Sequence, residues 1–213
     1  MKIILISPQS NIQKEQEFVN VLFEKGLDYF HLRKPGYSKE ELEAYLKQIK
    51  PAYYRKISVH SHYNLLEKYN LGGIHLPENV RKETNVKEIL KVAKKRSLQV
   101  STSIHSISEI KEMNAFSYVF LSPVFDSISK PDYKACISLP EFSTLKEITS
   151  IKTKVIALGG IEKNNLDKIL RAGFDGLALM GYIWKDFEKE PIIKNGLDKF
   201  LEVTTTVKEL SKV

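Results

Sequence analysis

The chain has 213 residues in one predicted domain, 1–213, and its 42% hydrophobic and 28% charged residues are typical of a soluble globular protein. The longest apolar run, 176–184, is far too short to cross a bilayer, so no membrane partner is expected. The net charge of +7 favours anionic partners, but the densest basic stretch, 87–96, lacks the aromatic residues of single-strand binders, so nucleic acid is not expected.

Strand-like and helix-like segments alternate along the whole chain. Short apolar segments predict eight strands, at 3–7, 29–33, 57–61, 73–76, 99–103, 118–122, 155–158 and 176–180. Amphipathic segments predict helices near 13–25, 38–50, 64–69, 86–96, 106–113, 138–148, 163–172 and 191–208. Ser38 and Glu41 have the spacing of a capping box, as do Ser106 and Glu109, and Pro191 suits the first turn of the last helix.

Eight strand–helix units in a chain of this length predict a closed (β/α)₈ TIM barrel, because parallel strands require helical crossovers. An open doubly wound sheet is the alternative. That fold places a glycine-rich turn after its first strand, whereas 7–10 of this chain read Ser-Pro-Gln-Ser. The barrel is therefore the predicted fold.

The predicted seventh and eighth strands both end in glycine. Gly159 and Gly160 follow the seventh, and Gly181 follows Met180 after the eighth. Glycine amides can approach an anion closely, and the loops after these two strands commonly bind a substrate phosphate in (β/α)₈ barrels. The sequence thus predicts a phosphate site and an enzyme that acts on a small phosphorylated molecule.

Two other strand ends carry groups suited to an anion. His31 and Arg33 lie two residues apart, so they share one face of the second strand, and an inward Arg33 needs either a substrate anion or an interior carboxylate. Few acidic residues lie at strand ends, which favours the substrate. After the sixth strand, Ser127, Ser129 and Lys130 offer two hydroxyls and a cation for a phosphate or diphosphate, unless they form an ordinary solvated loop.

All five histidines lie on or just after the predicted second to fifth strands. Each one alone is more often a hydrogen-bonded barrel residue, but imidazoles can also move protons near neutral pH or bind a transition metal. No HExxH or CxxC spacing is present, so the sequence assigns no metal ligand. The five are His31, His60, His62, His75 and His105.

At these positions the chain resembles the family of thiamine phosphate synthase and its relative, thiazole tautomerase (TenI-like). The resemblance extends over the whole chain, and its members are (β/α)₈ barrels. The synthase displaces diphosphate from hydroxymethylpyrimidine diphosphate with a thiazole phosphate and uses Mg²⁺, whereas the tautomerase isomerises a thiazole carboxylate phosphate. The matching segments are 30–33, 72–76, 103–106, 118–125 with the loop at 127–130, 157–161 and 172–176 with Met180.

The resemblance also implies roles for individual residues. It implies thiazole phosphate contacts at Gly159, Gly160, Met180 and Gly181, a loop of Ser127, Ser129 and Lys130 over the thiazole and diphosphate, and diphosphate contacts at Ser103 and Arg33. The candidate catalytic residues are Arg33, His31, His60, Ser103 and Lys130.

Other positions depart from the family pattern. The two Mg²⁺-binding aspartates of the synthase fall at Ser61 and near Val80, and neither side chain can replace a carboxylate on a hard cation, although Glu78 is close by in the sequence. A diphosphate-binding lysine falls at Pro35, beside Lys34. Mg²⁺ thus stays an open expectation, and no organic cofactor is expected.

Three further departures bear on the type of reaction. His31 stands where the synthase has glutamine, and His60 where it has asparagine. The catalytic histidine of the tautomerase falls at Pro123, which cannot transfer a proton.

The predicted function is therefore that of a thiamine-biosynthesis enzyme resembling thiamine phosphate synthase, with a phosphorylated thiazole and a pyrimidine diphosphate as substrates. A tautomerase-like isomerase using another histidine, and a non-catalytic protein that binds thiazole phosphate or thiamine phosphate, are the alternatives. A single cysteine, Cys136, and an N-terminus without signal-peptide features predict a cytoplasmic location. Whether the chain forms a homo-oligomer is open.

Overall fold

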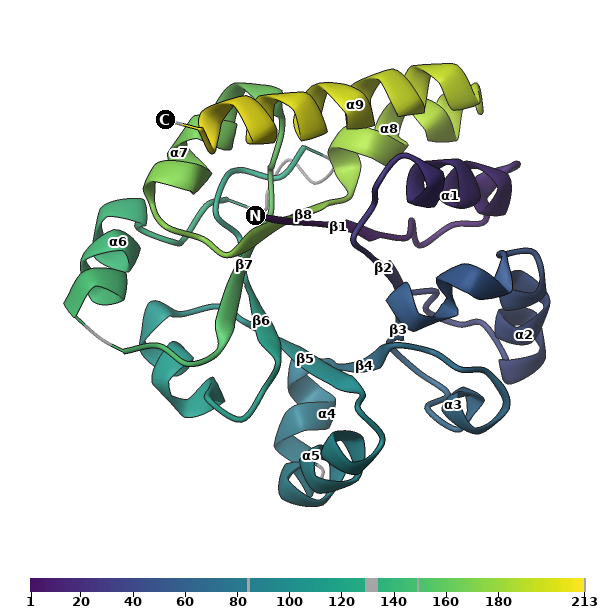
Figure 1. Ribbon diagram of the computed structural model, residues 1–213, viewed down its shortest axis with the longest axis horizontal. Helices are drawn as coiled ribbons and strands as arrows, with labels where there is room; N and C mark the ends of the chain where they lie inside the picture. The colour runs from purple at the N-terminus through teal and green to yellow at the C-terminus, as the bar shows by residue number, and fades with distance from the viewer. Residues whose placement is uncertain (84, 129–133, 149, 213) are drawn as a thin grey trace.

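The computed structural model describes residues 1–83, 85–128, 134–148 and 150–212, and its eight parallel strands close into a barrel in sequence order (Figure 1). The predicted (β/α)₈ TIM barrel is confirmed. The strands are β1 (Lys2–Ile6), β2 (Tyr29–Leu32), β3 (Ile57–Val59), β4 (Gly73–Leu76), β5 (Gln99–Ile104), β6 (Tyr118–Leu121), β7 (Lys154–Leu158) and β8 (Gly176–Leu179).

Helices surround the barrel and cover its outer face (Figure 1). The α-helices are α1 (Glu15–Glu24), α2 (Lys39–Lys47), α3 (Leu65–Lys68), α4 (Glu78–Glu83), α5 (Val86–Lys95), α6 (Leu139–Ile148), α7 (Leu166–Arg171), α8 (Gly181–Lys189) and α9 (Ile193–Leu210). Three 3₁₀ helices accompany them: η1 (Pro51–Lys56), η2 (Ile107–Met113) and η3 (Lys163–Asn165). None of the described helices is long and apolar enough to span a membrane.

Of the features predicted for helix starts, only the capping box of Ser38 and Glu41 is confirmed. Ser38 and Glu41 form the expected capping box, with Glu41 N donating to Ser38 Oγ at 3.2 Å and Ser38 N donating to Glu41 Oε2 at 2.7 Å. Ser106 instead accepts from the amide of Ser108, and the segment that follows is a 3₁₀ helix. Pro191 lies two residues before α9 rather than in its first turn.

Three elements were not predicted, namely η1, α4 and α8. Of these, α8 matters for function because it begins directly after β8. Its buried residues Ile183, Trp184 and Phe187 have helical spacing. No charged residue separates them from the apolar strand before them, so in the sequence β8 and the start of α8 form one continuous apolar segment. Trp184 Nε1 donates to the carbonyl of Ile6 at 2.7 Å, which attaches α8 to the end of β1.

The barrel interior divides into an apolar and a polar half. Side chains from β1, β6, β7 and β8 form an apolar interior cluster of Ile4, Ile6, Tyr118, Phe120, Ile156 and Ala178. The interior side chains of β2 to β5 are largely polar, and His31, Ser58, His75 and Ser101 are all buried. Buried polar groups need partners, so this half must form an internal hydrogen-bond network.

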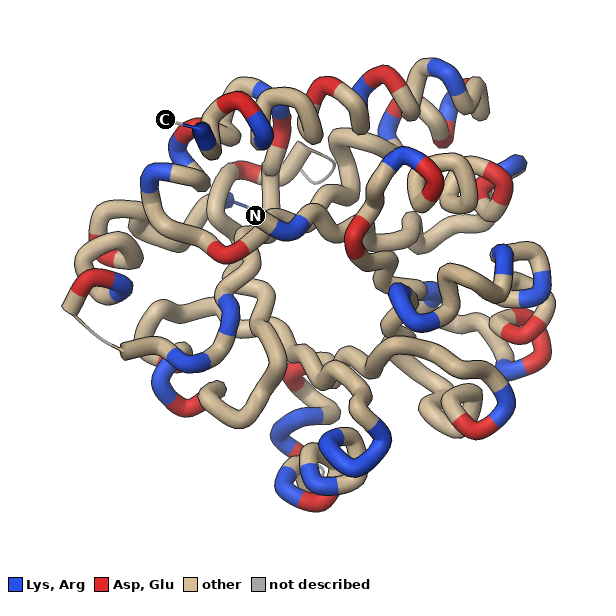
Figure 2. Tube along the Cα trace, viewed as in Figure 1, with Lys and Arg blue, Asp and Glu red and all other residues tan. Residues whose placement is uncertain are grey.

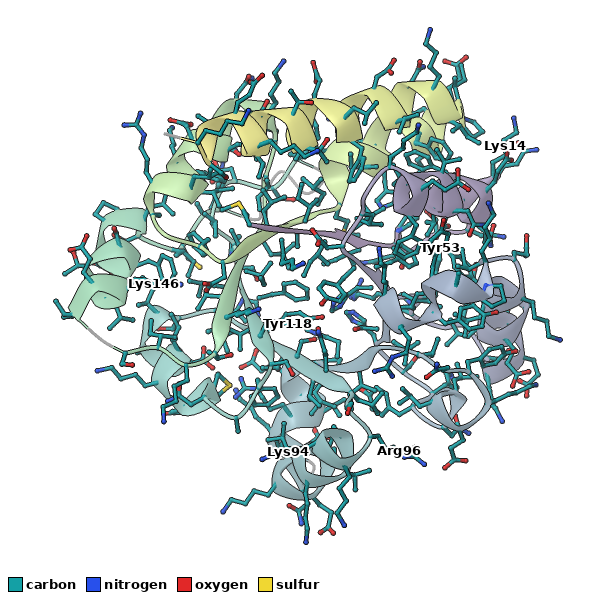
Figure 3. The ribbon with its side chains drawn as sticks, viewed as in Figure 1. Lys14, Tyr53, Lys94, Arg96, Tyr118 and Lys146 are labelled. Atoms are coloured by element: carbon teal, nitrogen blue, oxygen red, sulfur yellow. The ribbon has the colours of Figure 1, made fainter. Side chains whose placement is uncertain are left out.

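Charged residues gather on the outer helices and loops, while the strands carry few (Figure 2). Figure 3 shows the contrast for labelled side chains, since Tyr118 lies within the ring of strands and Lys94 and Arg96 lie at the outer edge. The basic stretch at 87–96 therefore belongs largely to the solvated face of α5 rather than to the barrel mouth.

Candidate active site

One cavity of about 410 Å³ lies at the carboxyl ends of the strands, which is where (β/α)₈ enzymes place their chemistry. It brings together most of the residues predicted from the sequence. Arg33, His60, Ser103, Ser127, Gly159, Gly160, Met180 and Gly181 all line it. The predicted residues Ser129 and Lys130 lie outside the described residues.

Arg33 lines this cavity and is held there by its backbone. Its amide donates to Ser7 Oγ at 2.7 Å, and the Ser7 hydroxyl donates back to the Arg33 carbonyl at 2.9 Å. No ion pair joins the guanidinium to a carboxylate among the residues that the structure describes. Burial lowers the pKa of Arg33, but an arginine stays cationic. The alternative for Arg33, an ion pair with an interior carboxylate, is therefore not formed among the described residues.

We expect Arg33→Ala to weaken binding of inorganic diphosphate by about tenfold or more, because one charge-assisted contact contributes roughly 1.5–3 kcal/mol. Titration calorimetry at fixed salt measures the change. Arg96→Ala is the matched control, since it removes the same charge from an exposed position outside the cavity. Equal loss in both variants would show that only the net charge of the protein matters.

The glycines after β7 are required by the backbone. Gly159 and Gly160 have φ values of +101° and +60°, which side chains rarely adopt. A Cβ on Gly160 would lie 2.2 Å from the carbonyl oxygen of Asp126, and one on Gly159 would lie 2.8 Å from Cα of Pro123. A side chain at either position would therefore collide with the backbone of the loop after β6. Gly160→Val would therefore test folding rather than ligand binding.

The start of α8 provides a more direct anion-binding feature. Met180 and Gly181 line the cavity, and α8 begins at Gly181. The first amides of a helix have no acceptor within the helix, and the helix dipole adds partial positive charge there. A short helix after the eighth strand is a common part of phosphate sites in this fold.

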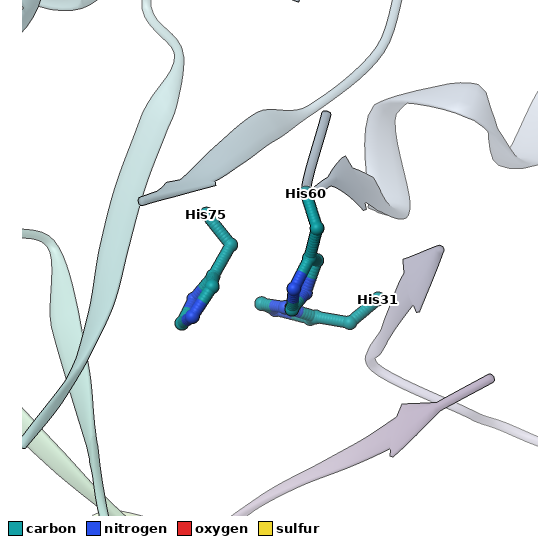
Figure 4. Close-up of side chains that lie close together, drawn as sticks. All are labelled: His31, His60 and His75. Carbon is teal, nitrogen blue, oxygen red and sulfur yellow. The ribbon is translucent and has the colours of Figure 1, made fainter. Parts of the chain in front are cut away.

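Three histidines form what we call the histidine cluster: His31, His60 and His75 (Figure 4). They come from the ends of β2, β3 and β4, and one ring nitrogen of each lies within 4.8 Å of the others. His31 Nδ1 lies 2.9 Å from His60 Nε2, and the His60 and His75 rings stack with centroids 4.2 Å apart. His60 and His75 line the cavity, whereas His31 is fully buried beneath them.

Hydrogen bonds fix the cluster from behind. His31 Nε2 lies 2.6 Å from the Tyr118 hydroxyl, and His75 Nδ1 lies 3.0 Å from Ser101 Oγ. Burial lowers the pKa of all three histidines, that of His75 to about 3, so the rings are neutral near pH 7. Burial also raises the pKa of Tyr118 to about 12, which keeps its proton on the hydroxyl.

The other two histidines do not join this cluster. His105 lines the cavity, with Nδ1 2.8 Å from the carbonyl oxygen of Ser122. His62 is exposed, and its Nε2 lies 3.0 Å from the carbonyl oxygen of Tyr37. The five histidines therefore separate into the histidine cluster, one residue at the mouth of the cavity and one surface residue.

Residues 3–183 match the model of one protein family, thiamine monophosphate synthase. The chain belongs to this family. The thiamine-phosphate synthase of Chlamydia caviae is 26% identical over 188 residues, covering 84% of this chain and 85% of that one. That of Listeria welshimeri is 30% identical over 130 residues, and the chain spans only 58% of its length.

Solved structures agree with the family assignment. The crystal structure of thiamine phosphate pyrophosphorylase from Bacteroides thetaiotaomicron covers 98% of both chains, with a TM-score of 0.78 and 30% identity. A thiamine phosphate pyrophosphorylase from Pyrococcus furiosus covers 98% of this chain with a TM-score of 0.75. At 21% identity, this similarity shows the shared fold alone.

Lys34 cannot replace the lysine that the family resemblance implies at Pro35. Its side chain is fully buried, and Nζ donates to Glu15 Oε2 at 2.6 Å and to the carbonyl of Ser10 at 2.6 Å. The Tyr45 hydroxyl donates to the other Glu15 oxygen at 2.8 Å. This buried group joins α1, α2 and the end of β2 and points away from the cavity, whose lining does not include Lys34.

Carboxylates are scarce around the cavity. Glu78 is the acidic residue among its described lining residues, and it already pairs with Lys82 at 2.6 Å and lies 3.7 Å from His105 Nε2. The hydrogen bond from Lys82 lowers the pKa of Glu78. Neither Ser61 nor Val80 belongs to that lining.

Proposed function

We propose that this chain joins hydroxymethylpyrimidine diphosphate to a thiazole phosphate and releases diphosphate. The reaction forms a bond between the thiazole and the pyrimidine methylene carbon while the bond from that carbon to diphosphate breaks. Membership of the thiamine monophosphate synthase family supports this reaction. The observation that supports it here is one cavity lined by two groups of residues suited to anions, as a reaction between two phosphorylated substrates requires.

The first group would hold the thiazole phosphate. It consists of the amides at the start of α8, at Met180 and Gly181, beside the glycine turn after β7. Backbone amides bind the terminal phosphate without contacting the reacting ring, so they fix the position of the thiazole. Fixing both reactants in one cavity lowers the entropic part of the barrier.

The second group would hold the diphosphate. Arg33 supplies a permanent positive charge and Ser103 a hydroxyl donor at the same cavity, and Ser127 adds a hydroxyl from the loop after β6. Negative charge on the diphosphate increases as its bond to carbon breaks, so a fixed cation stabilises the transition state more than the ground state. We assign this role to Arg33.

The magnesium chemistry of the family does not fit this chain. Mg²⁺ is usually bound through one or two carboxylates, and the one carboxylate on the described cavity lining, Glu78, pairs with Lys82. Ser61 and Val80 stand where the resemblance implies aspartates, and neither contributes an anionic oxygen. The proposed steps therefore use protein residues alone.

No observation favours the tautomerase alternative, since Pro123 occupies the position of its catalytic histidine. Release of diphosphate from hydroxymethylpyrimidine diphosphate, dependent on added thiazole phosphate, tests the reaction directly. Diphosphate and thiamine phosphate formed in equal amounts would support the proposal. Binding of both compounds without product under any metal condition would show a binding protein instead.

The phosphate position has its own test in Gly181→Asp. The new carboxylate would occupy the start of α8, where it favours the helix but repels a phosphate. Gly181→Asn is the matched control, because it has the same shape without the charge. We expect the aspartate variant to bind thiazole phosphate about tenfold or more weakly than the asparagine variant, as measured by calorimetry. Equal affinities would place the phosphate elsewhere.

A further inference from the structure

We propose that the histidine cluster, His31, His60 and His75, binds one divalent transition metal ion of the zinc class. Three imidazoles from consecutive strands converge at the base of the cavity, each with a ring nitrogen within 4.8 Å of the other two. Imidazole suits Zn²⁺, Co²⁺, Ni²⁺ and Cu²⁺, whereas Mg²⁺ prefers oxygen. The donor set therefore selects a different kind of metal from the one that the family resemblance implies.

The hydrogen bonds behind His31 and His75 occupy one nitrogen of each ring, so the other nitrogen of each ring is the one that would bind the metal. A ligating histidine usually donates its second N–H to a neighbouring group, which fixes its orientation. Tyr118 occupies Nε2 of His31 at 2.6 Å and leaves Nδ1 for the metal. Ser101 lies 3.0 Å from Nδ1 of His75 and leaves Nε2, whose 3.3 Å contact with Ser103 Oγ the metal would replace.

The ring positions require only a local rearrangement. Bonds of 2.0–2.1 Å in a tetrahedral zinc site place ligand nitrogens about 3.3 Å apart. His31 Nδ1 and His60 Nε2 lie 2.9 Å apart, so they would separate slightly. His75 would rotate out of its stack on His60 to bring its nitrogen closer.

The metal replaces the hydrogen bond between His31 and His60. If His31 keeps its proton on Nε2 for Tyr118, then His60 donates from Nε2 without metal and carries its proton on Nδ1 with metal. Both forms of His60 are neutral, so the exchange needs no net loss of a proton. The burial of the cluster favours this neutral form, which is the form that binds metals.

The cavity leaves one coordination position open. His60 and His75 line it, so an ion among the three nitrogens would face the space in which the proposed substrates bind. Three protein ligands with a fourth position open to solvent or substrate is the arrangement of catalytic rather than structural zinc sites. Arg33 lines the same cavity, and its charge opposes the ion unless an anion binds between them. The site is thus suited to a metal ion together with an anionic group of a substrate.

Titration of the chelator-treated full chain with Co²⁺ and Zn²⁺ tests the proposal. We expect one Co²⁺ per chain, with the intense visible absorption of four- or five-coordinate Co²⁺, and its displacement by Zn²⁺. His60→Asn should weaken binding by about 100-fold or more, since it removes a ligand from the partly exposed cavity wall. His31→Gln and His75→Asn should do the same, with circular dichroism as the check of folding.

His62→Asn is the matched control, because it removes an exposed histidine outside the cluster. It should bind Co²⁺ as the unmodified chain does. Absence of binding at micromolar Co²⁺ and Zn²⁺, or unchanged affinity in a folded His60→Asn variant, would overturn the proposal and leave the cluster as a hydrogen-bonded network. The readout needs no substrate, so its outcome is independent of the Gly181 test of the proposed function.

Discussion

Replacing Lys34 by methionine is expected to lower the free energy of unfolding by about 3–5 kcal/mol, because it leaves the Glu15 carboxylate buried without its cation. Both side chains of this pair have no exposed surface, and the Lys34 Nζ to Glu15 Oε2 distance is 2.6 Å. Burial raises the pKa of Glu15 and lowers that of Lys34, so each charge depends on the other. Urea unfolding followed by circular dichroism measures the change.

The double variant Lys34→Met/Glu15→Gln removes both charges together. It should recover much of the lost stability, because an amide at residue 15 can still accept a hydrogen bond from Tyr45 without leaving an unpaired charge. Lys50→Met is the matched control, since it removes a lysine from an exposed pair with Glu24 and should change stability little. A Lys34→Met variant as stable as Lys50→Met would contradict this account.

The same variants separate folding from ligand binding. Lys34 is next to Arg33 and to Pro35, where the family resemblance implies a lysine, so its position in the sequence alone suggests that it binds diphosphate. Its ion pair with Glu15 assigns it to the contact among α1, α2 and β2 instead. The folded double variant should therefore bind diphosphate as the unmodified chain does, in contrast to Arg33→Ala.

The fold could be predicted because each strand is short, apolar and followed by an amphipathic segment. These local patterns can be recognised without knowledge of tertiary contacts, and eight strand–helix repeats favour a closed barrel. Element ends could not be predicted as well. The boundary between β8 and α8 was missed because Ile183 and Trp184 are buried in the helix and continue the apolar run of the strand.

The sequence also predicted that Arg33 and the glycines after β7 and β8 would line the cavity, because the carboxyl ends of the strands meet at one mouth of the barrel. The histidine cluster could be anticipated only in part. A period of two indicates that His31 shares a face with Arg33, and His60 and His75 also lie where an inward side chain is plausible. The sequence does not distinguish three rings that merely face inward from three whose nitrogens converge within 4.8 Å. Those distinctions depend on register between strands and on side-chain partners such as Tyr118, which are distant in the sequence.

Magnesium is expected to accelerate diphosphate release by this chain poorly, about 100-fold less than in a family member that has both aspartates. Metal stabilisation of a leaving group is worth several kcal/mol, and each 1.36 kcal/mol changes a rate by about tenfold. Coupling of hydroxymethylpyrimidine diphosphate to thiazole phosphate, assayed with Mg²⁺ and then with Zn²⁺ or Mn²⁺, measures the effect. If the histidine cluster holds a metal near the diphosphate, Zn²⁺ should exceed Mg²⁺ as an activator.

The double variant Ser61→Asp/Val80→Asp tests the cause, with Ser61→Asn/Val80→Asn as the uncharged match. Val80 packs against the hydrophobic core, so both substitutions share a cost in packing, and only the aspartates add anionic oxygens. The aspartate variant should therefore gain Mg²⁺-dependent turnover over the asparagine variant. Robust turnover of the unmodified chain with Mg²⁺, not increased by the aspartates, would show that this chain neutralises the departing diphosphate by another route, with Arg33 as the cation on the described cavity wall best placed to do so.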